Sequence, residues 1–149
     1  MADPAPSPRP QVTRSEAAGK FKPSRAQEFR EILFGLVKLD GVRGGLIVTP
    51  DGLVINSELP QRFPVEALAA LAATLGRELE LGSDRLERGA FRTALFSSDD
   101  GTVFVGGSPV GYLTLLGDRN VNLASVRLAL RKAVDRLQGT WKPPAAGAA

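Results

Sequence analysis

The sequence predicts an α/β sandwich, in which helices cover both faces of a five-stranded, mainly antiparallel sheet. Three observations lead to this fold class. Three segments carry apolar residues at helical spacing, five short apolar segments are typical of strands, and tight turns join most of those strands. The predicted order along the chain is α-β-β-α-β-β-β-α, within one domain over residues 24–140.

The composition excludes several kinds of chemistry. The 149-residue chain contains no cysteine and no histidine. Zinc sites built on these side chains are therefore excluded, as are mechanisms that use histidine as a base. No disulfide can form, so packing must hold the fold together, which suits a cytoplasmic protein. We expect no metal, no cofactor and no catalytic residues.

Both ends of the chain are predicted to be flexible. Alternating prolines near the N-terminus predict a disordered arm over residues 1–23, and residues 141–149 form a short flexible tail. The N-terminus lacks the apolar segment of a signal peptide. No apolar run approaches the roughly 20 residues of a membrane span. We therefore expect a cytoplasmic protein that is not inserted in a membrane.

The net charge of +3 does not indicate nucleic-acid binding. Residues 24–140 contain 14 basic and 14 acidic side chains, so the excess of positive charge lies in the arm and the tail. A nucleic-acid interface needs a basic patch on the folded domain. We therefore expect no nucleic-acid partner.

The first helix and the first hairpin follow the arm. Ser24 is a helix-start signal with Gln27 three residues later, and Gly41 ends the helix. Two strands, Gly45–Thr49 and Leu53–Asn56, then flank a Pro-Asp-Gly turn. The first of these strands is apolar without alternation, which predicts burial on both of its faces.

A long second helix is predicted from Pro64 to about Leu81. It carries two apolar stripes. The larger side chains, which we expect to cover the sheet, are Leu68, Leu71, Ala72, Leu75 and Leu79. The smaller ones, which would let another backbone approach, are Val65, Ala69, Ala73 and Gly76. The alternative is that alanine was chosen only for its helix propensity.

Three strands and a last helix complete the domain. The strands are predicted at Phe91–Ser97, Thr102–Gly106 and Tyr112–Leu116, and a turn at Ser98–Gly101 joins the first two. The last helix runs from Asn122 to Gln138 with one apolar face.

No motif in the chain carries a recognisable reaction. Gly44-Gly45 leads into a strand rather than a phosphate-binding loop, and the glycine-rich segment around Ser108 has no base beside it. Asp99 and Asp100 occupy a turn, where aspartate is expected. What remains is surplus apolar surface on helices, which is typical of a protein that binds proteins.

The surplus apolar surface and the exposed charges predict which residues form the interfaces. We expect a homodimer that uses the small stripe of the second helix and the edge strand after it: Ala69, Ala73, Gly76, Phe91, Thr93 and Leu95. A further protein partner would bind Glu66, Arg77 and Glu78 on the opposite side of that helix. A cationic group on the last helix, with Arg127 and Arg131, indicates either a solvated surface or an acidic partner.

The sequence resembles the roadblock/dynein-light-chain family. The resemblance lies in GGLIVTPDGLVINSELP, in the Ala/Leu-rich helix after Pro64, and in YLTLLGDRNVNLASVRLALRKAVDRL, and it covers roughly Arg25 to Gln138. It implies a roadblock-like fold, similar to longin and profilin-like folds. It also implies dimerisation through the second helix and third strand.

The resemblance also indicates partners. Bacterial MglB-type members of the family bind Ras-like GTPases of the MglA type and stimulate hydrolysis without a catalytic site of their own. We therefore expect a non-catalytic homodimer that binds a small Ras-like GTPase. The alternatives are a structural adaptor dimer without a GTPase partner and a small-ligand sensor.

Overall fold

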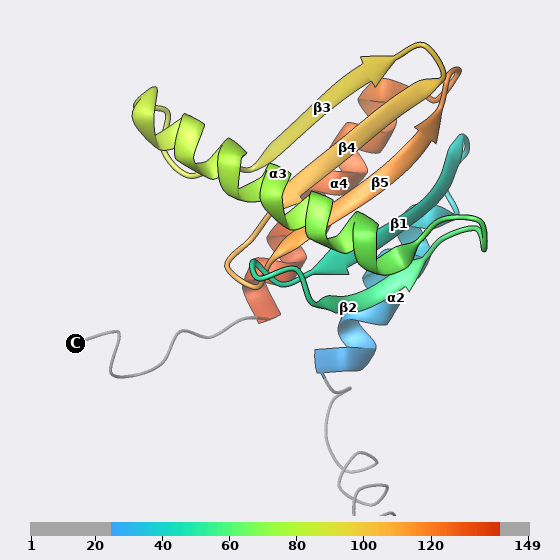
Figure 1. Cartoon of the computed structure of the whole chain (residues 1–149), viewed down its shortest axis with the longest axis horizontal. Helices are drawn as coiled ribbons and strands as arrows, with labels where there is room; N and C mark the ends of the chain where they lie inside the picture. Colours follow the sequence, from blue (N-terminus) through green and yellow to red (C-terminus); the bar gives the residue numbers. More distant parts are fainter. Residues whose placement is uncertain (1–24, 141–149) are drawn as a thin grey trace, which may run out of the picture.

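The computed structural model describes residues 25–140, so the predicted arm and tail lie outside the described residues. The predicted fold class and the order of its elements are confirmed (Figure 1). The elements are α2 (Arg25–Val37), β1 (Val42–Val48), β2 (Val54–Glu58), α3 (Val65–Arg85), β3 (Thr93–Ser98), β4 (Gly101–Gly107), β5 (Tyr112–Asp118) and α4 (Leu123–Thr140).

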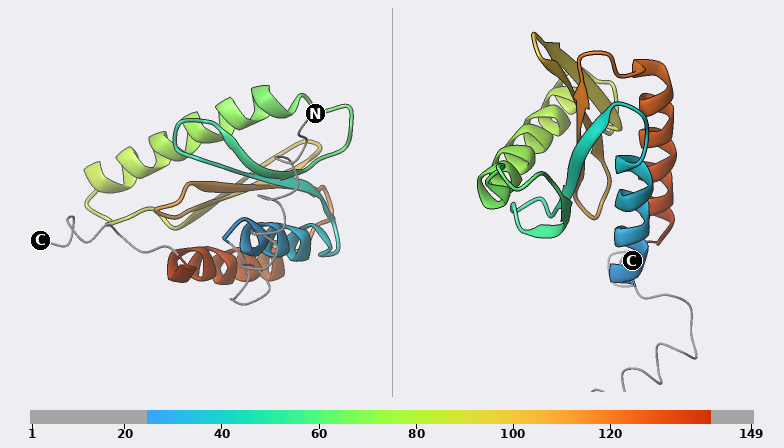
Figure 2. Two further views of the ribbon diagram at one scale, coloured as in Figure 1. Left: turned by 90° about the horizontal axis from the view of Figure 1, so that it is seen from below. Right: turned by 90° about the vertical axis from the view of Figure 1, so that its right-hand side faces the viewer.

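The strands form one sheet with the order β2-β1-β5-β4-β3, and every neighbouring pair is antiparallel. Helix α3 crosses one face of the sheet, and α2 and α4 lie side by side on the other face (Figure 2). Strands β2 and β3 are therefore the two edges of the sheet. The fold is a three-layer sandwich in which one layer has a single helix.

Strand β1 is buried on both faces, as its lack of alternation predicted. Leu46, Ile47 and Val48 are each no more than 1% exposed. Leu46 and Val48 pack in the cluster below α3, whereas Ile47 packs in the cluster below α2 and α4. The turn after β1 also forms as predicted, with Gly52 at a φ of 93° and the Thr49 hydroxyl accepting a 3.0 Å hydrogen bond from the Leu53 N–H.

The two faces of the sheet carry cores of different size. The cluster between the sheet and α2 and α4 contains most of the fully buried leucine, valine and phenylalanine side chains. The cluster below α3 is small and consists of Leu46, Val48, Ala69, Ala72, Ala73 and Tyr112. One helix therefore covers its face of the sheet less completely than two helices cover the other.

The prediction of which stripe of α3 faces the sheet was wrong for the small side chains and for Leu71, whereas Ala72 is buried as predicted and Leu68 packs against the same cluster. Ala69, Ala73 and Gly76 are buried against the sheet of the same protomer, so these residues are not available to a second copy. Leu71, which was expected to cover the sheet, is 62% exposed. The small stripe therefore belongs to the core, and the leucine stripe borders the uncovered part of the sheet.

The reason is the close approach of α3 to Tyr112 on β5. A methyl group built on Gly76 would lie 2.5 Å from ring carbons of Tyr112, much closer than side-chain carbons approach one another. Only glycine fits there, and the other buried residues of α3 are alanines, which also allow a close approach of helix and sheet.

The prediction for Phe91 was also wrong. Phe91 precedes β3 rather than lying in it, and its side chain is buried. Its ring lies over Gly107 at the end of β4, where an added Cβ would come within 2.7 Å of it. Phe91 is therefore a core residue of the protomer and not part of an exposed strand edge.

The contact between Gly76 and Tyr112 predicts an unusual response to alanine. Gly76→Ala should destabilise the protomer by about 1–3 kcal/mol, because the added methyl overpacks the ring. Gly82→Ala is the matched control on the same helix, since a Cβ there meets nothing within 4 Å. That change should stabilise by up to about 1 kcal/mol. Urea unfolding measures both, and equal effects would contradict this account of the helix position.

Candidate protein-interaction surface

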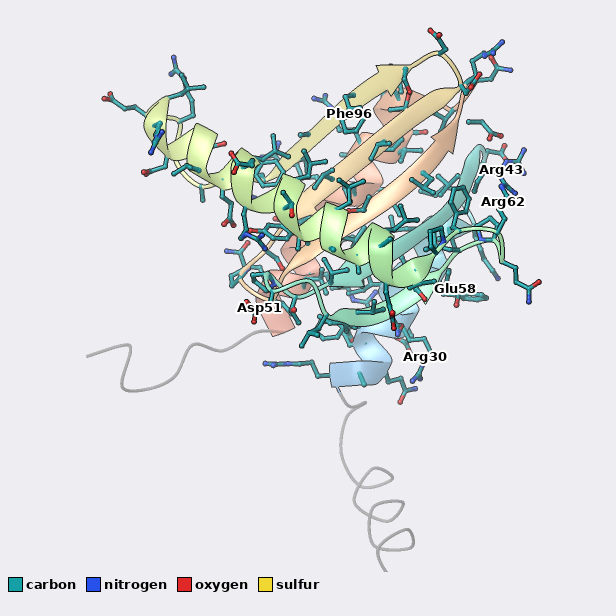
Figure 3. The ribbon with its side chains drawn as sticks, in the orientation of Figure 1. Arg30, Arg43, Asp51, Glu58, Arg62 and Phe96 are labelled. Atoms are coloured by element: carbon teal, nitrogen blue, oxygen red, sulfur yellow. The ribbon has the colours of Figure 1, made fainter. Side chains whose placement is uncertain are left out.

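An apolar groove lies beside α3 on the part of the sheet that the helix leaves uncovered. Its volume is about 160 Å³. Phe96 of β3 is 47% exposed and lies on the face of the sheet that carries α3 (Figure 3). We call this region the α3–β3 surface and define it by Leu68, Leu71, Leu75, Phe96, Val103 and Leu116.

The groove contains one unsatisfied polar group. Thr114 of β5 is 6% exposed, and its hydroxyl has no hydrogen-bond partner among the described residues. The hydroxyl belongs to a residue that lines the groove. A buried hydroxyl without a partner is costly, so Thr114 weakens the packing of the sheet beneath the groove.

The α3–β3 surface continues to an open sheet edge. Strand β3 pairs only with β4, so its outer backbone N–H and C=O groups have no partner within the described residues. The C-terminal end of α3 extends past β3 beyond the sheet (Figure 1). Leu81 in this projecting end and Leu86 directly after the helix are both exposed. Apolar side chains, an unpaired strand edge and a projecting helix thus lie together.

The predicted residues on β3 lie on the other side of that strand. Leu95 packs against the core cluster below α2 and α4, and Thr93 faces α4. Both side chains are half-buried. The side chains of Thr93 and Leu95 point towards α4 and the core, so in a dimer only the backbone of their strand would contact the second copy, and that contact remains a prediction. Phe96, which the sequence reasoning did not single out, is the β3 side chain that faces α3.

The predicted partner-binding residues are exposed on α3. Glu66 lies in its first turn, and Arg77 and Glu78 lie further along the helix. Arg77 also donates a hydrogen bond to the carbonyl oxygen of Pro50, in the turn between β1 and β2. Arg77 therefore ties α3 to that turn, a role that the sequence pattern gave no means of detecting.

Tyr112 holds α3 from the sheet side. Its hydroxyl donates a 2.9 Å hydrogen bond to the Glu80 carboxylate. Burial of the phenol, and then the bond to Glu80, raise the pKa of Tyr112 to about 12. The polar end of the ring is thus satisfied while its face packs on Gly76.

The motifs set aside in the sequence have local structural roles. The Ser108 hydroxyl bonds to the Gly111 carbonyl at 3.2 Å within its own turn, and Asp100 pairs with Arg119 at 3.3 Å. Within residues 25–140, no three carboxylates gather in a way that would hold a metal ion. In the same range, no helix has both the length and the hydrophobicity needed to span a bilayer.

Comparison with known proteins identifies the family. The sequence model of the Roadblock/LC7 domain matches residues 28–116, so the chain belongs to this family. Among curated proteins, the uncharacterized protein MJ0714 of Methanocaldococcus jannaschii is 29% identical over 110 residues, which is 74% of this chain and 93% of that protein.

Solved structures agree on the fold. Myxococcus xanthus MglB superposes with a TM-score of 0.71 at 18% identity, over 80% of this chain and 92% of that one. An MglB described with a tetrameric arrangement gives a TM-score of 0.67 at 18% identity, over 80% of this chain and 91% of that one. Acanthamoeba castellanii profilin II gives 0.55 at 15% identity, over 78% and 98% of the two chains, which confirms the expected similarity to profilin-like folds.

The burial of Tyr112 and its hydrogen bond to Glu80 predict that the phenol of Tyr112 titrates at an unusually high pH. The chain contains one tyrosine, so tyrosinate absorbance reports this residue alone. The pKa of Tyr112 is raised in the folded state from 10.0 to about 12, so its contribution to stability is complete below pH 10 and is lost as the pH rises towards 12.

In the folded protein the absorbance midpoint should therefore lie near pH 12, and in urea near the ordinary value of 10.0. Glu80→Ala should lower the folded-state midpoint, because it removes the hydrogen-bond acceptor. A folded-state midpoint equal to that in urea would mean that the phenol is solvated.

Proposed function

We propose that the chain is a non-catalytic homodimer that binds and regulates a small Ras-like GTPase. The observation that carries the proposal is the α3–β3 surface, where apolar side chains border an open strand edge. Exposed apolar surface of this kind marks interaction sites, and an unpaired edge is a template for another strand. Membership of the Roadblock/LC7 family supports a regulatory or scaffolding role.

The dimer would form through β3. Pairing two copies of this edge strand antiparallel joins the two sheets into one and places a two-fold axis perpendicular to it. Both α3 helices then lie on the same face of the joined sheet. The projecting end of each α3 would cover the apolar groove of its partner, so Leu81 and Leu86 would face the α3–β3 surface of the other copy. This self-complementarity is what an isologous interface requires.

The GTPase would bind the outer surface of the paired α3 helices. Glu66, Arg77 and Glu78 are exposed there, and charged residues at the rim of an interface steer association more than they increase affinity. The support for a GTPase is the resemblance to MglB-type members of the family. Stimulation of hydrolysis would come from fixing the switch segments of the GTPase itself. A dimer that binds no GTPase would be a structural adaptor.

Replacing Phe96 by aspartate should convert the dimer to a monomer, because the charge would be buried between the two copies. Phe34→Asp is the matched control, since Phe34 is 49% exposed on α2, on the opposite face of the sheet, and Phe96 is 47% exposed. Light scattering at micromolar concentration gives the masses. A monomeric wild type, or a dimeric Phe96→Asp variant, would rule out this interface.

The GTPase surface is tested with Glu66→Lys combined with Glu78→Lys, which leaves the structural contact of Arg77 intact. Association with a Ras-like GTPase encoded in the same genome should slow by about tenfold at low salt, with the dimer unchanged. Glu31→Lys with Asp40→Lys makes the same charge change on the α2 side and should bind normally. Surface plasmon resonance measures the rates. If only the α2-side variant slows association, the GTPase binds the other face.

A further inference from the structure

A second surface lies on α4, on the opposite face of the sheet from α3. A hollow of about 100 Å³ opens between α4 and the start of β3. It is lined by Thr93, Ala124, Arg127, Leu128 and Arg131. Because β3 is an edge strand, nothing among the described residues closes the hollow on its outer side.

The two arginines in the hollow have no acidic partner. Arg127 and Arg131 lie one helical turn apart, and no carboxylate of the described residues pairs with either. Two arginines nearby are paired instead: Arg92 with Asp135, and Arg136 of α4 with Glu28 at 2.6 Å. Two guanidinium groups on one helix face repel each other weakly, and a carboxylate placed between them would relieve this.

The hollow also has an apolar component. Leu128 is 57% exposed, and it lines the hollow together with both arginines. A simple anion would gain nothing from this leucine. A segment that presents acidic and apolar side chains together would use both the charges and the leucine.

The rest of the chain does not supply such a segment. Residues 1–23 contain four basic and two acidic side chains, and residues 141–149 contain one lysine and no acidic side chain. Both segments carry the wrong charge for the hollow. Nucleic acid is a poor fit because the domain as a whole has balanced charge and offers no extended basic surface.

We propose that the hollow on α4 binds an acidic, amphipathic segment of another protein. The carboxylates of that segment would pair with Arg127 and Arg131, and its apolar side chains would pack on Leu128. This partner would bind independently of the GTPase, because α4 and α3 lie on opposite faces of the sheet.

The proposed dimer would place two such hollows close together. Helix α4 contacts β3 and β4, so pairing through β3 brings the two α4 helices to the same face, on either side of the axis. The closeness of two hollows rests on the proposed homodimer, whereas binding of a segment by one hollow does not. A monomer would bind one segment per chain with the same intrinsic affinity.

The test uses a fluorescent helical peptide with leucines at helical spacing and glutamates between them, and fluorescence anisotropy with the full-length protein. Arg127→Glu with Arg131→Glu should weaken binding at least about tenfold. Arg30→Glu with Lys38→Glu is the matched control: it makes the same charge change on α2 and directly after its end (Arg30 is labelled in Figure 3) and should bind like the wild type. Affinity should also fall as salt is raised.

The apolar contribution has its own variant. Leu128→Ser, or a peptide with serines in place of its leucines, should weaken binding several-fold while the charges are kept. Light scattering and circular dichroism on each variant establish that the oligomeric state and fold are unchanged, which separates failure of this proposal from failure of the proposed dimer.

Three results would overturn the proposal. The first is that the wild type does not bind the peptide. The second is that the α4 and α2 variants lose equal affinity for the peptide, which would mean that binding depends only on the total charge of the protein. The third is recruitment to phosphatidylcholine–phosphatidylglycerol vesicles without peptide binding, which would make the α4 surface a membrane contact.

Discussion

The contact between Gly76 and the ring of Tyr112 determines how α3 sits on the sheet. Because a glycine and three alanines face the strands, the helix axis lies close to β5, and a larger side chain has no room at Gly76. The leucines are therefore displaced to the side of the helix, where Leu71 is largely exposed. Two polar contacts hold the helix in this position: the hydroxyl of Tyr112 bonds to Glu80, and Arg77 bonds to the carbonyl of Pro50.

The unequal covering of the sheet follows from this arrangement. Helices α2 and α4 bury large side chains on their face, whereas α3 alone covers part of the other face with alanines. The remaining area keeps Phe96 and the leucine stripe exposed beside the open edge of β3. A larger side chain at Gly76 could not help to close this area, because the ring of Tyr112 leaves no space for it. A second polypeptide chain can cover it, and this is the physical basis of the proposed dimer.

The elements of the fold could be predicted from the sequence because they depend on short-range patterns. Burial of β1 on both faces followed from three consecutive apolar residues, and the first turn followed from Pro-Asp-Gly. The packing of α3 could not be predicted in the same way. Helical periodicity shows which residues share a stripe, but both stripes of α3 are apolar, and the choice between them depends on a ring far away in the sequence. Phe91 was misplaced for a similar reason, since a local pattern does not separate a strand from a loop residue that packs on Gly107.

The two surfaces differ in charge, although the domain as a whole is neutral. Helix α3 carries four acidic and two basic side chains, whereas α4 carries four basic and one acidic side chain. The sheet separates these helices, so partners of different chemistry can bind at the same time without competing for space. Mutual influence between them would have to pass through the sheet, where β3 and β4 contact α4 on one side and β4 and β5 contact α3 on the other. A scaffold with opposite charges on two faces is therefore suited to holding a GTPase and a second, acidic protein together.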